Sequence, residues 1–132
     1  MATILVVDDE PDLVEIVRYR LERDGHTVLT ADDGESGLAR VLADEPDLIV
    51  LDVIMPRLDG FEMLRRLKRE RAYTTAGTAT PVLLLTARAD FAAISQGWEE
   101  YADAYMIKPF NIDELARTVQ NLLSRSGKLQ AG

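Results

Sequence analysis

The chain has 132 residues and is 47% hydrophobic, which is enough for one globular domain with a substantial core. Its 23 acidic and 15 basic residues give a formal net charge of -8, which disfavours direct binding to nucleic acids or anionic membranes. We expect a cytoplasmic protein whose metal ligands are oxygen atoms, because there is no cysteine and no apolar run approaches the roughly 20 residues of a membrane span.

Along the chain, short apolar runs alternate with segments of helical periodicity. Four of the runs are unbroken, as in strands that are covered on both faces of a parallel sheet, and one alternates like an edge strand. In chain order the predicted strands are ILVV (4–7), HTVLTA (26–31), LIVL (48–51), VLLL (82–85) and AYMI (104–107).

Five helices are predicted between and after these strands. Pro11 suits the first turn of the first helix and Gly25 its C-terminal cap, while Asn111 is a candidate N-cap for the last helix. Gly97 weakens the fourth helix. The predicted helices are 11–25 with an apolar stripe of Leu13, Ile16, Val17 and Leu21, 34–46 with Leu38, Val41 and Leu42, 60–72 with Phe61, Leu64 and Leu67, 89–101, and 111–125 with Ile112, Leu115, Val119 and Leu122.

This alternation predicts an α/β fold in which a parallel sheet carries helices on both faces, with a ligand site at the carboxyl ends of the strands. Polar residues collect at those ends. Asp8 and Asp9 follow the first run, Asp52 follows the third, Thr86 the fourth and Lys108 the fifth. The topology therefore predicts that these five side chains meet in one crevice.

Each of these residues also has an ordinary structural explanation. Asp8 or Asp9 alone could cap the next helix, Thr86 could be a turn residue, and Lys108 could be a solvated loop charge. Asp52 is harder to explain in this way, because it lies between apolar residues. The coincidence at successive strand ends favours a shared functional site.

The chemistry of such a crevice points to a cation and a phosphate. Carboxylates within about 4 to 6 Å of one another repel strongly unless a cation lies among them. Oxygen ligands suit Mg²⁺, which is usually held by one or two carboxylates together with a phosphate. A carboxylate can then act as the nucleophile in phosphoryl transfer, while a lysine neutralises charge and a threonine hydroxyl donates to a phosphoryl oxygen.

The segments ILVVDDEP, LIVLDVIMPRLDG, VLLLTA and AYMIKPF resemble the receiver domain of two-component response regulators, and the resemblance spans residues 3 to 125. It implies a single doubly wound, flavodoxin-like domain with a five-stranded parallel sheet of order 2-1-3-4-5 and five helices. We expect this domain at residues 1–125 and a polar tail at 126–132, in either a stand-alone regulator or an excised piece of a larger one.

The resemblance also implies a role for each residue that matches the family's motifs. The implied roles are phosphoacceptor for Asp52, catalysis for Asp52, Thr86 and Lys108, Mg²⁺ binding for Asp8, Asp9, Asp52 and the carbonyl of Ile54, switching for Thr86 and Tyr105, and a cis peptide bond before Pro109.

By this resemblance the chain accepts a phosphoryl group from a sensor histidine kinase or histidine phosphotransfer protein and then changes conformation. It would catalyse only its own phosphorylation and dephosphorylation, so we do not class it as an enzyme. An output protein or a second copy is expected on the surface formed by the fourth helix, fifth strand and fifth helix, near Trp98. His26, the only histidine, is expected to be structural.

Three alternatives remain open at this point. A haloacid-dehalogenase-like phosphatase also uses a strand-end aspartate and Mg²⁺, but it needs a second acid where this chain has Ile54. A flavodoxin-like nucleotide binder needs a phosphate-cradling loop where this chain has DDEPD. A receiver-like interaction module that is never phosphorylated would need no intact set of chemical residues.

Overall fold

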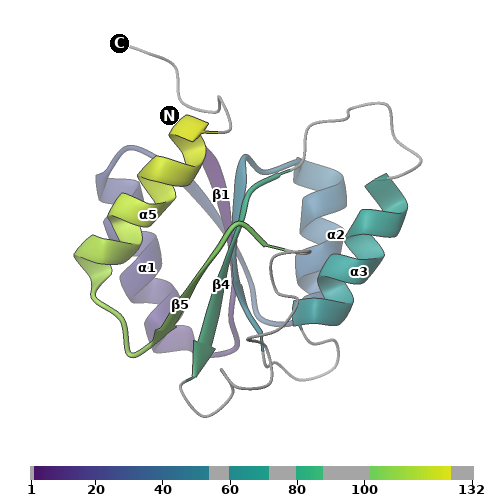
Figure 1. The fold of residues 1–132 in the computed structure, drawn as a ribbon, viewed down its shortest axis with the longest axis horizontal. Coiled ribbons are helices and arrows are strands. Elements are labelled where there is room, and N and C mark those ends of the chain that lie inside the picture. The colour runs from purple at the N-terminus through teal and green to yellow at the C-terminus, as the bar shows by residue number, and fades with distance from the viewer. Residues whose placement is uncertain (1, 54–59, 72–79, 88–101, 126–132) are drawn as a thin grey trace.

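The computed structural model describes residues 2–53, 60–71, 80–87 and 102–125, with the side chains of 68, 70 and 71 excepted. Strands and helices alternate along these residues (Figure 1). The elements are β1 (Thr3–Val7), α1 (Pro11–Arg23), β2 (Thr27–Ala31), α2 (Gly34–Asp44), β3 (Leu48–Asp52), α3 (Gly60–Arg71), β4 (Val82–Ala87), β5 (Ala104–Lys108) and α5 (Ile112–Arg125).

All neighbouring strands are parallel, and their order is β2-β1-β3-β4-β5, which confirms the predicted topology. Four of the five predicted helices lie within the described residues, whereas the one predicted at 89–101 and the tail at 126–132 lie outside them. Among the described helices, none combines the length and the apolar character that crossing a membrane requires.

Strict alternation along the buried strands divides the core into two layers. In β1, Ile4 and Val6 pack with α1 and α5, whereas Leu5 and Val7 pack with α2 and α3. Figure 1 shows the same division, with α1 and α5 on one side of the sheet and α2 and α3 on the other. Burial on both faces explains why the strands are unbroken apolar runs.

Two of the predicted helical stripes are partly wrong. Ile16 is 57% exposed and Leu42 is 46% exposed, although both were expected to face the core. A helix turns by about 100° per residue, and in α1 the buried stripe is Val14, Val17 and Leu21. Ile16 lies one position away from Val17 and is rotated to the solvent side.

The predicted helix ends are confirmed. Pro11 opens α1, and Gly25, which has a φ of 98°, follows its C-terminal end. The Asn111 side-chain oxygen accepts hydrogen bonds from the backbone N–H groups of Asp113 at 2.8 Å and Glu114 at 3.2 Å. Local residue chemistry therefore sets where these helices start and stop.

Two aspartates fix the register of the sheet at its amino-terminal edge. Asp47 directly precedes β3, and its carboxylate accepts a hydrogen bond from the N–H of Thr3 in β1 at 2.8 Å. Asp103 directly precedes β5 and accepts from the N–H of Val82 in β4 at 2.8 Å. Because a strand that slips by one residue turns its side chains to the other face, these anchors also help to fix the side chains at the opposite edge.

His26 is buried at the start of β2, where its Nδ1 accepts a hydrogen bond from the backbone N–H of Ala2 at 3.3 Å. Burial lowers the pKa of the imidazole below its ordinary value of 6.5. The imidazole of the unfolded chain therefore binds a proton more readily than that of the folded chain. The neutral His26 ring thus contributes its full share to the stability of the fold above pH 6.5, and this contribution is lost as the pH falls below that value.

We expect the parent to lose more free energy of unfolding between pH 6.5 and about 5 than a His26→Gln variant does, because the variant has no titrating ring at this position. Urea unfolding at several pH values measures the difference. Parallel pH profiles for the two proteins would contradict the assignment.

Gly60 opens α3 and lies against the end of β3. Its N–H donates to the carbonyl oxygen of Val53 at 2.8 Å. A Cβ atom here would lie 2.7 Å from the carbonyl oxygen of Asp52 and 3.0 Å from the Cα atom of Val53. Since both atoms belong to the backbone, either the strand end or the start of α3 would have to shift to make room.

We therefore expect Gly60→Ala to cost about 1–3 kcal/mol of stability and to move Asp52. Gly37→Ala is the comparison, because both sites gain helix propensity but the nearest atoms at Gly37 belong to the side chains of Val7 and Met63. Chemical denaturation and the amide NMR shift of Asp52 report the two effects. Equal stability of the parent and Gly60→Ala would show that the strand end yields freely.

Candidate functional site

The site lies at the carboxyl ends of β1 and β3, where the strand order reverses. After β1 the chain passes to β2 on one side, and after β2 it crosses over to β3 on the other side of β1. In parallel α/β sheets this switch point is where ligands bind. Three of the polar residues predicted to meet there belong to strands: Asp52 ends β3, Thr86 lies in β4 and Lys108 ends β5.

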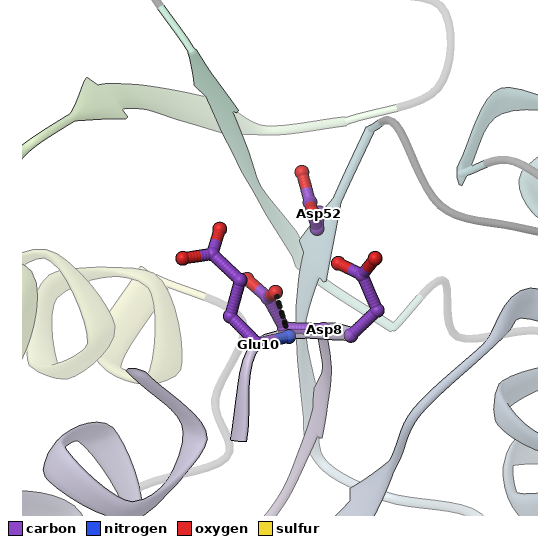
Figure 2. Close-up of side chains that lie close together, drawn as sticks. Asp8, Glu10 and Asp52 are labelled. Carbon is purple, nitrogen blue, oxygen red and sulfur yellow. Dashed lines mark hydrogen bonds between the residues drawn. The ribbon is translucent and has the colours of Figure 1, made fainter. Parts of the chain in front are cut away.

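Four carboxylates converge at this point. Asp8, Asp9, Glu10 and Asp52 each offer one oxygen atom, and these atoms all lie within 4.8 Å of one another. Asp8 and Asp52 are buried, whereas Asp9 and Glu10 are exposed. Figure 2 shows Asp8 and Glu10 at the end of β1 and Asp52 on β3, with their side chains gathered in one region.

Sequence reasoning found three of these acids and missed Glu10. The sequence did contain an indication of Glu10, because this residue continues the acidic run that Asp8 and Asp9 begin.

The capping explanation for the two aspartates is wrong. Glu10 occupies the N-cap position of α1, no side chain caps that helix end, and Asp8 Oδ1 instead accepts from the N–H of Glu10 at 3.0 Å.

Lys108 reaches this cluster from β5. Its Nζ atom lies 2.8 Å from Glu10 Oε1, 3.0 Å from Asp8 Oδ2 and 3.4 Å from Asp52 Oδ2. The first two distances are ordinary charge-assisted hydrogen bonds, whereas the third is an ion pair beyond hydrogen-bonding range. The lysine therefore bonds to residues that lie 98 and 100 positions earlier in the chain, and it joins β5 to the end of β1.

Burial and charge act in opposite directions on the two buried partners. Burial is the largest influence on Asp8 and raises its pKa, although the hydrogen bonds from Glu10 and Lys108 work against it. Burial is also the largest single influence on Lys108 and would lower its pKa. The hydrogen bonds to Glu10 and Asp8 and the charges of Asp52 and Asp8 together outweigh it, so the pKa of Lys108 is raised and the side chain stays an ammonium.

The arrangement has an excess of negative charge. By formal charge, four carboxylates and one ammonium leave three negative charges in a small volume. The donor atoms are all carboxylate oxygens, and two of the carboxylates are exposed to solvent. Such a set fits a hard divalent cation that retains several waters.

Solvent can reach this set from one side. An open hollow of about 510 Å³ lies beside it and is lined by residues that include Asp8, Asp9, Asp32 and Arg40. A hydrated ion or a small anionic reactant would fit in this volume.

Three of the four remaining predicted site residues lie within the described residues. Thr86 is fully buried, and its Oγ1 donates to the carbonyl oxygen of Ala87 at 3.2 Å. Tyr105 is partly buried and packs with the core layer of α2 and α3. The peptide bond between Lys108 and Pro109 is cis, as predicted. Ile54 lies outside the described residues.

Comparison with known proteins gives a consistent result. Residues 4–120 match the family model of the response regulator receiver domain. The chain is 43% identical over 123 residues to the alkaline phosphatase synthesis transcriptional regulatory protein PhoP of Bacillus subtilis, covering 93% of this chain and 49% of that protein. It is 39% identical over 129 residues to the DNA-binding dual master transcriptional regulator RpaA of Synechocystis, covering 98% and 52%.

The chain thus spans about half the length of the curated relatives that it matches. Among solved structures, the receiver domain of the Francisella response regulator 1452 aligns with a TM-score of 0.82 at 31% identity, covering 96% of this chain and 99% of that one. The chemotaxis response regulator CheY4 of Vibrio cholerae aligns with a TM-score of 0.78 at 33% identity, covering 93% and 99%.

The excess negative charge predicts that the cluster destabilises the fold when no cation is bound. We expect Asp9→Asn to raise the free energy of unfolding by about 1 kcal/mol in low salt without divalent cations, as surface-charge relief commonly does. Added salt should reduce the gain, and Mg²⁺ should remove it by stabilising the parent.

Asp12→Asn is the matched control, because it removes an equal charge from the first turn of α1, outside the four-carboxylate cluster. Thermal unfolding with a chelator, and then with added Mg²⁺, measures these effects. A variant less stable than the parent under chelation would mean that Asp9 is held by favourable contacts.

Proposed function

This chain belongs to the response regulator receiver domain family, and from that premise we propose that Asp52 is the residue that accepts the phosphoryl group. The main observation behind this proposal is the position of Asp52. Its buried carboxylate ends β3, lies within 4.8 Å of the acids that follow β1, and is ion-paired with Lys108 at 3.4 Å. Signal transduction in a two-component system is the family's function, and Asp52 is where this chain would receive the signal.

The proposed reaction is an in-line displacement at phosphorus. A carboxylate oxygen of Asp52 forms the new P–O bond while the P–N bond to the donor imidazole breaks, and the bonding electrons leave with the imidazole nitrogen. The product is an aspartyl phosphate. The negative charge on the transferring oxygens is the main obstacle, so the reaction depends on cationic groups around Asp52.

The donor set fits Mg²⁺ as the divalent cation. Asp8, Asp9 and Asp52 would hold it, with the main-chain carbonyl of Ile54 proposed from the family's motif. When bound, the ion supplies charge neutralisation at the phosphoryl oxygens. Lys108 supplies a second positive charge, and its raised pKa keeps that charge present at any physiological pH.

Thr86 and Tyr105 are proposed to convert the new charge into a structural change. The Thr86 hydroxyl is already committed to Ala87, so it must rotate to donate to a phosphoryl oxygen. By strand alternation, Thr86 in β4 and Tyr105 in β5 point to the same face as Leu84, which is the face that α2 and α3 cover. A shift of Thr86 therefore changes the space that is open to Tyr105.

The proposed phosphoryl donor is a histidine outside residues 1–132. His26 is the only histidine in the chain, and it is buried at the amino-terminal end of β2, whereas the site lies at the carboxyl ends of the strands. We propose a sensor histidine kinase or a histidine phosphotransfer protein as the donor, acting in the cytoplasm. The chain would then catalyse only its own modification and would not turn over other substrates.

The output is proposed from the relatives' printed names, which describe transcriptional regulators about twice as long as this chain. The net charge of -8 argues against DNA contact by this domain itself. We propose that it acts on an attached or separate output partner, or on a second copy, through the surface of β5, α5 and residues 88–101, which include Trp98 and lie outside the described residues.

In the presence of Mg²⁺ and acetyl phosphate, we expect the parent to gain the mass of one phosphoryl group and Asp52→Asn to gain none. Hydroxylamine should remove the group, because an acyl phosphate is reactive toward nitrogen nucleophiles. Asp32→Asn, which removes an exposed acid beside the same hollow, should behave like the parent. Intact-mass spectrometry decides the matter, and a normal yield from Asp52→Asn would place the nucleophile elsewhere.

A further inference from the structure

Glu10 has an arrangement that the proposed reaction leaves unexplained. It stands at the N-cap of α1, where an oxygen-bearing side chain normally accepts from the first turn of the helix, but its side chain makes no capping hydrogen bond. The side chain is 58% exposed and so has solvent on most sides. It nevertheless lies 2.8 Å from Lys108 Nζ, which is the shortest of the three ion pairs that this lysine forms with described residues.

The contacts of Lys108 show what this pairing does. An ammonium group has three N–H donors. Two of them form hydrogen bonds, to Glu10 and Asp8, while the third can point only loosely toward Asp52 at 3.4 Å. Lys108 is therefore anchored to the residues that follow β1 and keeps one donor directed toward the proposed phosphoacceptor.

A divalent cation changes this balance. Asp8, Asp9 and Asp52 are the acids assigned to it in the proposed function, so the cation competes with Lys108 for the oxygens of Asp8 and Asp52. Glu10 is the one acid of the described cluster that has no assigned part in holding the cation. It is also the lysine's nearest partner, so it can keep the ammonium in place while the others are engaged.

We propose, building on the phosphorylation of Asp52, that Glu10 is a positioning residue for Lys108. It holds the ammonium beside the site once the divalent cation occupies the aspartates, and it leaves one N–H donor free for the incoming phosphoryl oxygen. Glu10 touches neither the phosphoryl group nor the attacking oxygen in this scheme, and it acts only through the lysine.

This role predicts the opposite sign from a simple charge effect. Acetyl phosphate is an anion, so removing a nearby carboxylate should speed its reaction if Glu10 acted only through its charge. Loss of positioning should slow the reaction instead. At saturating Mg²⁺, where differences in metal affinity no longer matter, we expect Glu10→Gln to be phosphorylated roughly threefold to tenfold more slowly than the parent.

The experiment combines this rate with an NMR measurement of the Lys108 ammonium group. Ammonium groups held in ion pairs exchange their protons slowly enough to give ¹⁵Nζ signals in NMR spectra. We expect the Lys108 signal in the parent with and without Mg²⁺. In Glu10→Gln it should remain without Mg²⁺, when Asp8 still holds the ammonium, and should be lost when Mg²⁺ is added. Asp12→Asn is the charge-matched control and should resemble the parent in both measurements.

A double-mutant cycle closes the test. In a Lys108→Met background, Glu10→Gln should cause no further slowing, because the group that it positions is gone. A Glu10→Gln rate equal to or faster than the parent's, a Lys108 signal that survives Mg²⁺ in this variant, or the same slowing in both backgrounds would each overturn the role of Glu10. Failure of the parent itself to take up phosphate would instead refute the proposed function, and the lysine signal would still decide where Lys108 is held.

Discussion

Four carboxylates that repel one another are held together at one edge of the parallel sheet, and the function proposed for the site depends on this arrangement. Asp8, Asp9, Glu10 and Asp52 lie within hydrogen-bonding reach of a common point, and the Lys108 ammonium offsets only part of their charge. Such a cluster is unfavourable for folding by itself. A bound divalent cation would offset the remaining negative charge, so the electrostatic cost of the cluster would also favour binding of such an ion.

The rest of the fold holds this arrangement in place. The strands β1, β3 and β4 are buried on both faces, and their side chains fill two core layers without buried polar interruption until the carboxyl ends are reached. Asp47 and Asp103 fix the register at the opposite edge, and Gly60 lets α3 start against the backbone of Asp52. The sheet therefore holds Asp52, which ends β3, close to the three acids that directly follow β1.

The residues of the site are also divided between the two faces of the sheet. Asp52 and Lys108 follow the strand positions that point toward α1 and α5, whereas Thr86 and Tyr105 follow those that point toward α2 and α3. The residues of the proposed charge neutralisation thus lie on one side and those of the proposed conformational response on the other. Within such a layout, Glu10 could set the availability of Lys108 without touching the residues that respond to phosphorylation.

The sequence by itself determined the fold class, the strand positions, the helix ends at Gly25 and Asn111, and the identity of Asp8, Asp9, Asp52, Thr86 and Lys108 as residues of the strand ends, because these follow from local periodicity and residue chemistry. Only the tertiary structure decided that Ile16 and Leu42 face solvent, that Glu10 joins the cluster, and that Lys108 bonds to Asp8 and Glu10 more closely than to Asp52. The physical reason is that a hydrogen bond depends on differences of less than 1 Å, which are set across strands distant in sequence by register, packing and the rotation of each helix.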